Sequence, residues 1–176
     1  MACKVPLVLG GAEVAEYVGI PTIAAITAAL EALEEIDATG KLEIILMGGM
    51  RDGIDIVKSL ALGAHAAAVG TSVLIAGGCI ACMQCHVGQC VTGIATQDPE
   101  HEKRYKPEVE AKNIHRYLEG LRWQIAALTH AIGHKSVHDL NRNDLVALTP
   151  EAAEMTKLPY APEYREREDA LRAQVS

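Results

Sequence analysis

The chain has 176 residues, which is about the length of one domain and enough to bury a substantial core. Hydrophobic residues make up 49 % of it, with no Phe and one Trp, a composition that suits helices packed on short buried strands. The formal net charge is −7 and the sequence has no block of Lys and Arg. This argues against a nucleic-acid partner, because phosphate binding needs clustered cations.

The first residues, MACKVPLVLGG, contain one Lys and a short apolar run. Such a run is too short for a secretory signal, and the sequence has no stretch of about 18 apolar residues that could span a membrane. We therefore expect a cytoplasmic protein, in a compartment where disulfides are rare.

In the first half of the chain, predicted strands alternate with predicted helices. In chain order, we expect an uncertain extended piece at Cys3–Gly11, a helix at Thr22–Ile36, a strand at Leu42–Met47, a helix at Ile54–Leu62 capped by Asp52, a strand at Ala66–Val69 and a brief helix at Ser72–Ala76. This order is typical of a parallel α/β architecture. A complete (β/α)8 barrel needs about 250 residues, so this chain cannot contain one.

Both of the clear strands end in a glycine turn followed by a helix. The first turn is Met47-Gly48-Gly49-Met50-Arg51, and the second is Val69-Gly70-Thr71-Ser72. Free backbone N–H groups at such turns attract phosphate, and glycine lets the phosphate approach the backbone closely. Two such turns on neighbouring strands predict a phosphate site, to which Arg51 could add a charged group.

Four of the five cysteines lie within twelve residues, in the spacing Cys79-x2-Cys82-x2-Cys85-x4-Cys90. A disulfide knot, a zinc site and an iron–sulfur cluster are all compatible with such a segment. Structural zinc usually takes two separated pairs of ligands, whereas iron–sulfur clusters are often bound by cysteines of one short loop. The spacing therefore favours an iron–sulfur cluster, and we assign no metal-binding role to the neighbouring His86.

The second half of the chain reads as helical. A long amphipathic pattern predicts a helix at Glu108–Ile132, followed by a short one at Ser136–Leu140 and another that begins after Thr149. The charged tail Glu163–Arg172 is expected to be a solvated helix or a frayed end.

The segment from Gly48 to Glu100 contains the motifs GGxRxG, LGA, VGT, a cysteine-rich loop, CHxGxC and TGIATQDP, in that order. It strongly resembles the FMN-binding synthase domain of glutamate synthase, most of all the archaeal-type large subunit. The resemblance covers roughly Val18 to Tyr160 and corresponds to the C-terminal portion of that domain.

The resemblance implies an α/β fold that is a partial (β/α)8 barrel, about its last two βα units, followed by an iron–sulfur loop and C-terminal helices. Residues 1–76 would be the barrel part, 77–100 the cluster loop and 101–176 the helical region. It implies that Gly48, Gly49, Arg51, Gly70 and Thr71 hold the phosphate of FMN. It also implies that Cys79, Cys85 and Cys90 bind a [3Fe–4S] cluster, and the additional Cys82 leaves a [4Fe–4S] cluster open.

The family reaction is the FMN- and iron–sulfur-dependent reductive amination of 2-oxoglutarate with ammonia to give glutamate. The resemblance therefore implies an oxidoreductase that works as a fragment or subunit. Its partners would be the remaining part of the synthase barrel, a glutamine amidotransferase unit, and an electron-donor subunit or ferredoxin. Open strand edges also predict an oligomer.

Several positions depart from the family pattern. Met47 replaces a usual Ser or Asp, Val91 replaces a common Pro, and a Gly-Thr-Gly-Ala-x-Pro stretch is not found before this region. The amine substrate and the catalytic residues are left open, and an N-methylglutamate synthase-like enzyme is a related reading. The alternative function is a truncated, non-catalytic iron–sulfur module for electron transfer or scaffolding, and the chain could also be a fragment with no independent function.

Overall fold

The computed structural model describes residues 19–163. Its centre is a parallel pair of short strands, β1 (Ile45–Met47) and β2 (Ala66–Ala68), in which Leu46 pairs with Ala67. The connection between the strands is a helix, as parallel pairing requires. The predicted α/β character is therefore confirmed at this level.

From residue 19 onward, the first half contains the helices α2 (Thr22–Glu35), α3 (Gly53–Leu62) and α4 (Thr71–Ala76). Helix α3 begins where the Asp52 carboxylate accepts hydrogen bonds from the backbone N–H groups of Ile54 and Asp55. It ends at Gly63, whose left-handed conformation (φ 116°) closes the last turn.

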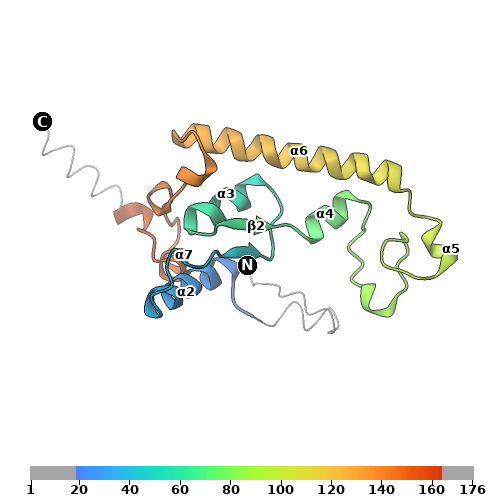
Figure 1. The fold of residues 1–176 in the computed structure, drawn as a ribbon, viewed down its shortest axis with the longest axis horizontal. Coiled ribbons are helices and arrows are strands. Elements are labelled where there is room, and N and C mark those ends of the chain that lie inside the picture. The colour runs from blue at the N-terminus through green and yellow to red at the C-terminus, as the bar shows by residue number, and fades with distance from the viewer. Residues whose placement is uncertain (1–18, 164–176) are drawn as a thin grey trace, which may run out of the picture.

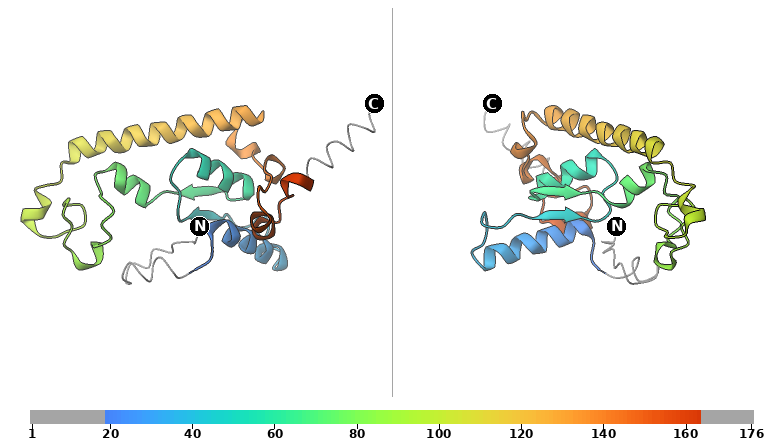
Figure 2. Two further views of the ribbon diagram at one scale, coloured as in Figure 1. Left: turned by 180° about the vertical axis from the view of Figure 1, so that it is seen from behind. Right: turned by 45° about the vertical axis from the view of Figure 1, so that its right-hand side comes forward.

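The second half is dominated by α6 (Pro107–Ile132), which lies across α3 and α4 (Figure 1). The shorter elements are the 3-10 turns η1 (Cys85–Val87), η2 (Val137–Asp139) and η3 (Arg142–Asp144) and the helices α5 (Pro99–Glu102) and α7 (Pro150–Thr156). The cysteine segment lies at one end of the molecule, with α2 and α7 at the other (Figure 2).

The core lies on one face of the strand pair. Leu46 of β1 packs with Ile26 of α2, Leu62 of α3 and Ala64. A second cluster contains Val57 and Ala61 of α3 and Leu140, which follows η2. Ile125 and Leu128 of α6 pack against it, so this cluster joins α3 to α6. Helix α3 is therefore held between the sheet and α6.

The other face of the strand pair remains exposed. Successive side chains of a strand point to opposite faces, so Ile45 and Met47 lie opposite to Leu46. They are 65 % and 54 % exposed, whereas Leu46 is buried. Two adjacent apolar side chains on a sheet face are the arrangement expected where another layer packs.

Most predicted elements appear within one or two residues of their expected bounds, although β1 is shorter than the predicted Leu42–Met47. The predicted pieces Cys3–Gly11 and most of Glu163–Arg172 lie outside the described residues. None of the helices between residues 19 and 163 combines the length and the apolarity that a membrane span requires.

Candidate cofactor sites

The first glycine turn follows β1 directly. Gly48 and Gly49 both have positive φ values, 125° and 73°, which glycine adopts without strain. A Cβ atom on Gly49 would have no other atom within 4 Å, so the backbone here faces open space. The turn can therefore be approached closely by a ligand.

The second glycine turn follows β2 and lies beside the first. Gly70 precedes α4 and likewise has open space where a Cβ would lie. The hydroxyl of Ser72 donates a hydrogen bond to the carbonyl oxygen of Met50 over 2.9 Å, which joins the two turns. Parallel strands bring their carboxyl ends to the same edge, and this contact holds the two turns together there.

Arg51 is engaged within its own turn. Its Nε lies 3.0 Å from Oδ2 of Asp55, and its backbone N–H donates to the same oxygen over 3.1 Å. The hydrogen bond with Asp55 raises the pKa of Arg51, so the guanidinium stays charged. Asp55 accepts hydrogen bonds from Nε and, over 3.4 Å, from Nη2 of Arg51. The predicted contact of Arg51 with phosphate therefore depends on the guanidinium N–H groups that do not point to Asp55.

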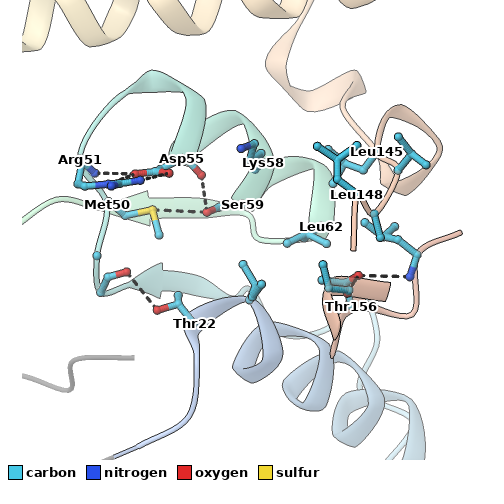
Figure 3. A pocket seen from close by; sticks show the side chains of 17 residues that line it. Thr22, Met50, Arg51, Asp55, Lys58, Ser59, Leu62, Leu145, Leu148 and Thr156 are labelled. Carbon is cyan, nitrogen blue, oxygen red and sulfur yellow. Dashed lines mark hydrogen bonds and ion pairs between the residues drawn. The ribbon is translucent and has the colours of Figure 1, made fainter. Parts of the chain in front are cut away.

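A cavity of about 430 Å³ opens next to the first turn (Figure 3). Gly48, Gly49 and Arg51 line it, whereas Gly70 and Thr71 do not. Its surface is mostly apolar, and the rest of its lining comes from α2, α3, α7 and the segment that includes Leu145 and Leu148. The structure thus brings three of the five predicted flavin-site residues to one cavity and places the other two at the adjoining turn.

The cysteine segment is a loop with several left-handed residues. Gly78, Gly88 and Gly93 have positive φ, and so do the non-glycine residues Ala81 and Met83. Cys79, Cys82, Cys85 and Cys90 are not joined in disulfides in the structure. A second, more polar cavity of about 560 Å³ adjoins Cys85, His86 and the turn at 94–98.

Among the four thiols, Cys90 is the one that is buried and that has a side-chain hydroxyl beside its sulfur. Its sulfur lies 3.3 Å from Oγ1 of Thr92, and it is only 5 % exposed. The Thr92 hydroxyl, together with backbone N–H groups of Ala95, Thr92 and Ile94, lowers the pKa of Cys90 to about 6. Cys90 is therefore mainly a thiolate at neutral pH, which is the form that binds metal.

The donor set of this loop fits an iron–sulfur cluster in its chemistry. It offers four thiol sulfurs, and backbone or hydroxyl donors lie against two of them, including the N–H of Ala81 at 3.4 Å from the Cys79 sulfur. Within residues 19–163, however, no three His, Cys, Asp or Glu side chains are gathered as metal ligands. Binding a cluster therefore requires the loop to close around it.

The contacts of four supporting residues were not foreseen from the sequence: those of Asp55, Ser72, Thr92 and Tyr117. Tyr117 of α6 donates a hydrogen bond from its hydroxyl to the carbonyl oxygen of Arg51 over 2.8 Å. Helix α5 was also missed, although Asp98 followed by Pro99 is a recognisable start signal: the Asp98 side chain accepts from the N–H of Glu100.

Comparison with known proteins gives the same family that the motifs indicate. A family model described as "Conserved region in glutamate synthase" matches residues 10–135. This match includes both glycine turns and the whole cysteine loop.

Individual relatives agree with it. A glutamate synthase large subunit-like protein of Rhizobium meliloti is 36 % identical over 83 % of this chain and 37 % of its own length. An archaeal glutamate synthase [NADPH] of Methanocaldococcus jannaschii is 39 % identical over 73 % of this chain and 25 % of its own length. A ferredoxin-dependent glutamate synthase of Cyanidium caldarium is 34 % identical over 65 % of this chain and 7 % of its own length.

The chain thus spans 37 % or less of the length of these relatives, although most of its own residues take part in the matches. A match that covers most of the chain and keeps the glycine turns and the cysteine loop together shows common descent. The chain belongs to the glutamate synthase family, a family of oxidoreductases.

Proposed function

We propose that this chain is the part of a glutamate synthase that holds the phosphate of FMN and an iron–sulfur cluster, for the reductive amination of 2-oxoglutarate with ammonia to glutamate. The observation that carries the proposal is the pair of glycine turns at the same ends of two adjacent parallel strands, joined by the Ser72–Met50 hydrogen bond. When bound, the flavin and the cluster supply the hydride and electron transfer.

The proposed fold is the end of a (β/α)8 barrel. Helices α2 and α3 both pack on the Leu46 face of the strand pair, as outer helices of a barrel do, and the Ile45 face would line the interior. In such barrels the phosphate site commonly lies at the last two strand-to-helix loops. We assign Gly48, Gly49, Gly70 and Thr71 to backbone contacts with the flavin phosphate, with Arg51 as the neighbouring positive charge.

In the cluster loop, we assign Cys79, Cys85 and Cys90 as ligands of a [3Fe–4S] cluster. Cys82 would be the fourth ligand of a [4Fe–4S] form. The four thiols lie in one loop, and the thiolate preference of Cys90 supports a metal-binding role for the loop.

The partners follow from the length of the relatives. The remaining part of the synthase barrel would complete the flavin site, a glutamine amidotransferase unit would supply ammonia, and an electron-donor subunit or ferredoxin would supply electrons. The chain's coverage of a quarter to about a third of its first relatives is consistent with other parts being needed.

The test is anaerobic purification of the chain followed by assays of iron, acid-labile sulfide and flavin, with an absorption spectrum. We expect iron and sulfide in a cluster stoichiometry, and FMN binding once the rest of the barrel is supplied as the corresponding part of a relative. Iron without FMN under both conditions would favour the non-catalytic electron-transfer module. Zinc in place of iron would contradict the proposal.

Cysteine variants identify the ligands in the same assays. Cys79→Ser, Cys85→Ser or Cys90→Ser should abolish the cluster, because a three-iron cluster needs all three thiolates. Cys82→Ser should keep a three-iron form, and Cys3→Ser, outside the motif, serves as the matched control. Loss of all iron in Cys82→Ser would show that the ligand assignment is wrong.

A further inference from the structure

The turn that follows Cys90 places one side-chain donor against the sulfur. Oγ1 of Thr92 lies 3.3 Å from the Cys90 sulfur, within the distance of a hydrogen bond that involves sulfur. A sulfur bound to iron carries no proton, so in a cluster the hydroxyl must be the donor of this bond. Thr92 is a residue to which neither the motif spacing nor the proposed ligand set gives a role.

The position of this hydroxyl is fixed by the backbone around it. The N–H of Gly93 donates to the carbonyl oxygen of Cys90 over 3.2 Å and closes a tight turn. Arg104 donates to the carbonyl oxygen of Val91 over 3.2 Å, which fastens the same turn to the segment after α5. Thr92 is thus held between two anchored residues.

Gly93 itself adds to this restraint. Its φ is +83°, and a Cβ atom there would lie 2.4 Å from the carbonyl oxygen of His101. The turn therefore packs directly on the backbone of α5, with no room for a side chain. This contact, together with the two hydrogen bonds of the turn, restrains the backbone that carries Thr92 beside the Cys90 sulfur.

We propose that Thr92 is a positioning residue whose hydroxyl donates a hydrogen bond to the Cys90 sulfur and thereby raises the reduction potential of the cluster. This inference rests on the proposed function, because it needs a cluster on Cys90. A reduced cluster carries one more electron than an oxidised one, and part of that charge lies on the sulfur ligands. A hydrogen-bond donor stabilises the more negative state, so hydrogen bonds to sulfur are among the groups that set the potential of such clusters.

The hydrogen bond from Thr92 to the Cys90 sulfur can be removed by a substitution, because its donor is a side chain. The N–H of Ala81, which lies 3.4 Å from the Cys79 sulfur, belongs to the backbone and remains in any variant other than proline. Thr92→Val removes only the hydroxyl and keeps the branched shape, whereas Thr92→Ser keeps the hydroxyl.

The experiment compares Thr92→Val, Thr92→Ser and wild type in the full chain, purified anaerobically. Iron and sulfide content are measured first, and the reduction potential is then determined by a redox titration followed by absorption and electron paramagnetic resonance. Thr129→Val is the matched control, because the Thr129 hydroxyl donates to the carbonyl oxygen of Ile125 in its own helix, near the end of α6 that lies far from the loop.

We expect Thr92→Val to retain iron and to be reduced with an equilibrium constant about tenfold lower, which corresponds to about 59 mV for one electron. Thr92→Ser and Thr129→Val should match wild type.

Two results would overturn the inference while leaving the proposed function intact. One is an unchanged potential in an iron-loaded Thr92→Val. The other is an equal change in Thr92→Val and Thr92→Ser, which would show that the hydroxyl is not the cause. A wild-type chain that binds no iron would instead overturn the proposed function, and this inference with it.

Discussion

Two glycines with nearly the same φ angle allow the role of the first turn to be tested residue by residue. Gly49, in the turn after β1, has φ +73°, and Gly40, between α2 and β1, has φ +75°. At both positions a Cβ atom would meet no atom within 4 Å. A substitution by alanine therefore places the residue at a similarly unfavourable φ at both sites and causes no clash at either.

We expect Gly49→Ala and Gly40→Ala each to lower the free energy of unfolding by about 1 kcal/mol, because a left-handed conformation is unfavourable for alanine. Only Gly49→Ala should also weaken FMN binding, by about tenfold, because its methyl group would keep the phosphate from the backbone N–H groups. Denaturant unfolding and a flavin titration, in the presence of the rest of the barrel, measure the two effects. Equal flavin affinities would remove Gly49 from the phosphate site.

At the scale of elements, α6 positions the start of α3 and with it the first glycine turn. Oε1 of Gln124 accepts a hydrogen bond from the N–H of Gly53 over 2.8 Å, and Tyr117 bonds to the carbonyl oxygen of Arg51. The two helices approach so closely that a Cβ on Gly53 would lie 2.6 Å from Cβ of Gln124 and 3.1 Å from the backbone nitrogen of Ile125. The glycine at the start of α3 is thus required by packing.

Replacing the two helical glycines by alanine should have opposite effects on stability. Gly53→Ala should destabilise the chain by about 1–3 kcal/mol, because the added methyl group forces α3 away from α6. Gly120→Ala should stabilise it by about 1 kcal/mol, because Gly120 lies within α6 with open space around it, and alanine is the better helix former. Chemical unfolding followed by circular dichroism measures both, and a stabilised Gly53→Ala would contradict the close helix contact.

The same elements show what can be predicted from sequence. Both bounds of α3 follow from local signals, Asp52 and Gly63, and the start of α7 follows from Thr149 with Pro150. The glycine turns were also predictable, because glycines after a strand are a local pattern. The bond from Tyr117 to Arg51 was not, since it joins residues 66 positions apart that only the packing of α6 brings together.

At the scale of the whole molecule, the main feature is that helices cover one face of the strand pair and leave the other face exposed. Helices cover the Leu46 side, while Ile45 and Met47 are exposed on the other. Among residues 19–163, each of the two strands pairs only with the other, so each has an open edge. An exposed apolar face bounded by open strand edges favours association, either with the rest of a barrel or with a second copy of the chain.

In the absence of the rest of the barrel, we therefore expect the chain to self-associate through this face. Ile45→Lys should shift the chain toward the monomer, because a charged side chain on the face opposes its burial between copies. Ile36→Lys is the matched control, since Ile36 is 68 % exposed and Ile45 65 %, but Ile36 lies at the end of α2, outside the sheet.

Because both side chains are exposed, neither substitution should change the free energy of unfolding by more than about 0.5 kcal/mol. Sedimentation equilibrium over a range of concentrations measures the association. If the two variants associate equally, the exposed sheet face is not the surface that brings the copies together, and its proposed place in the interior of a barrel loses its support.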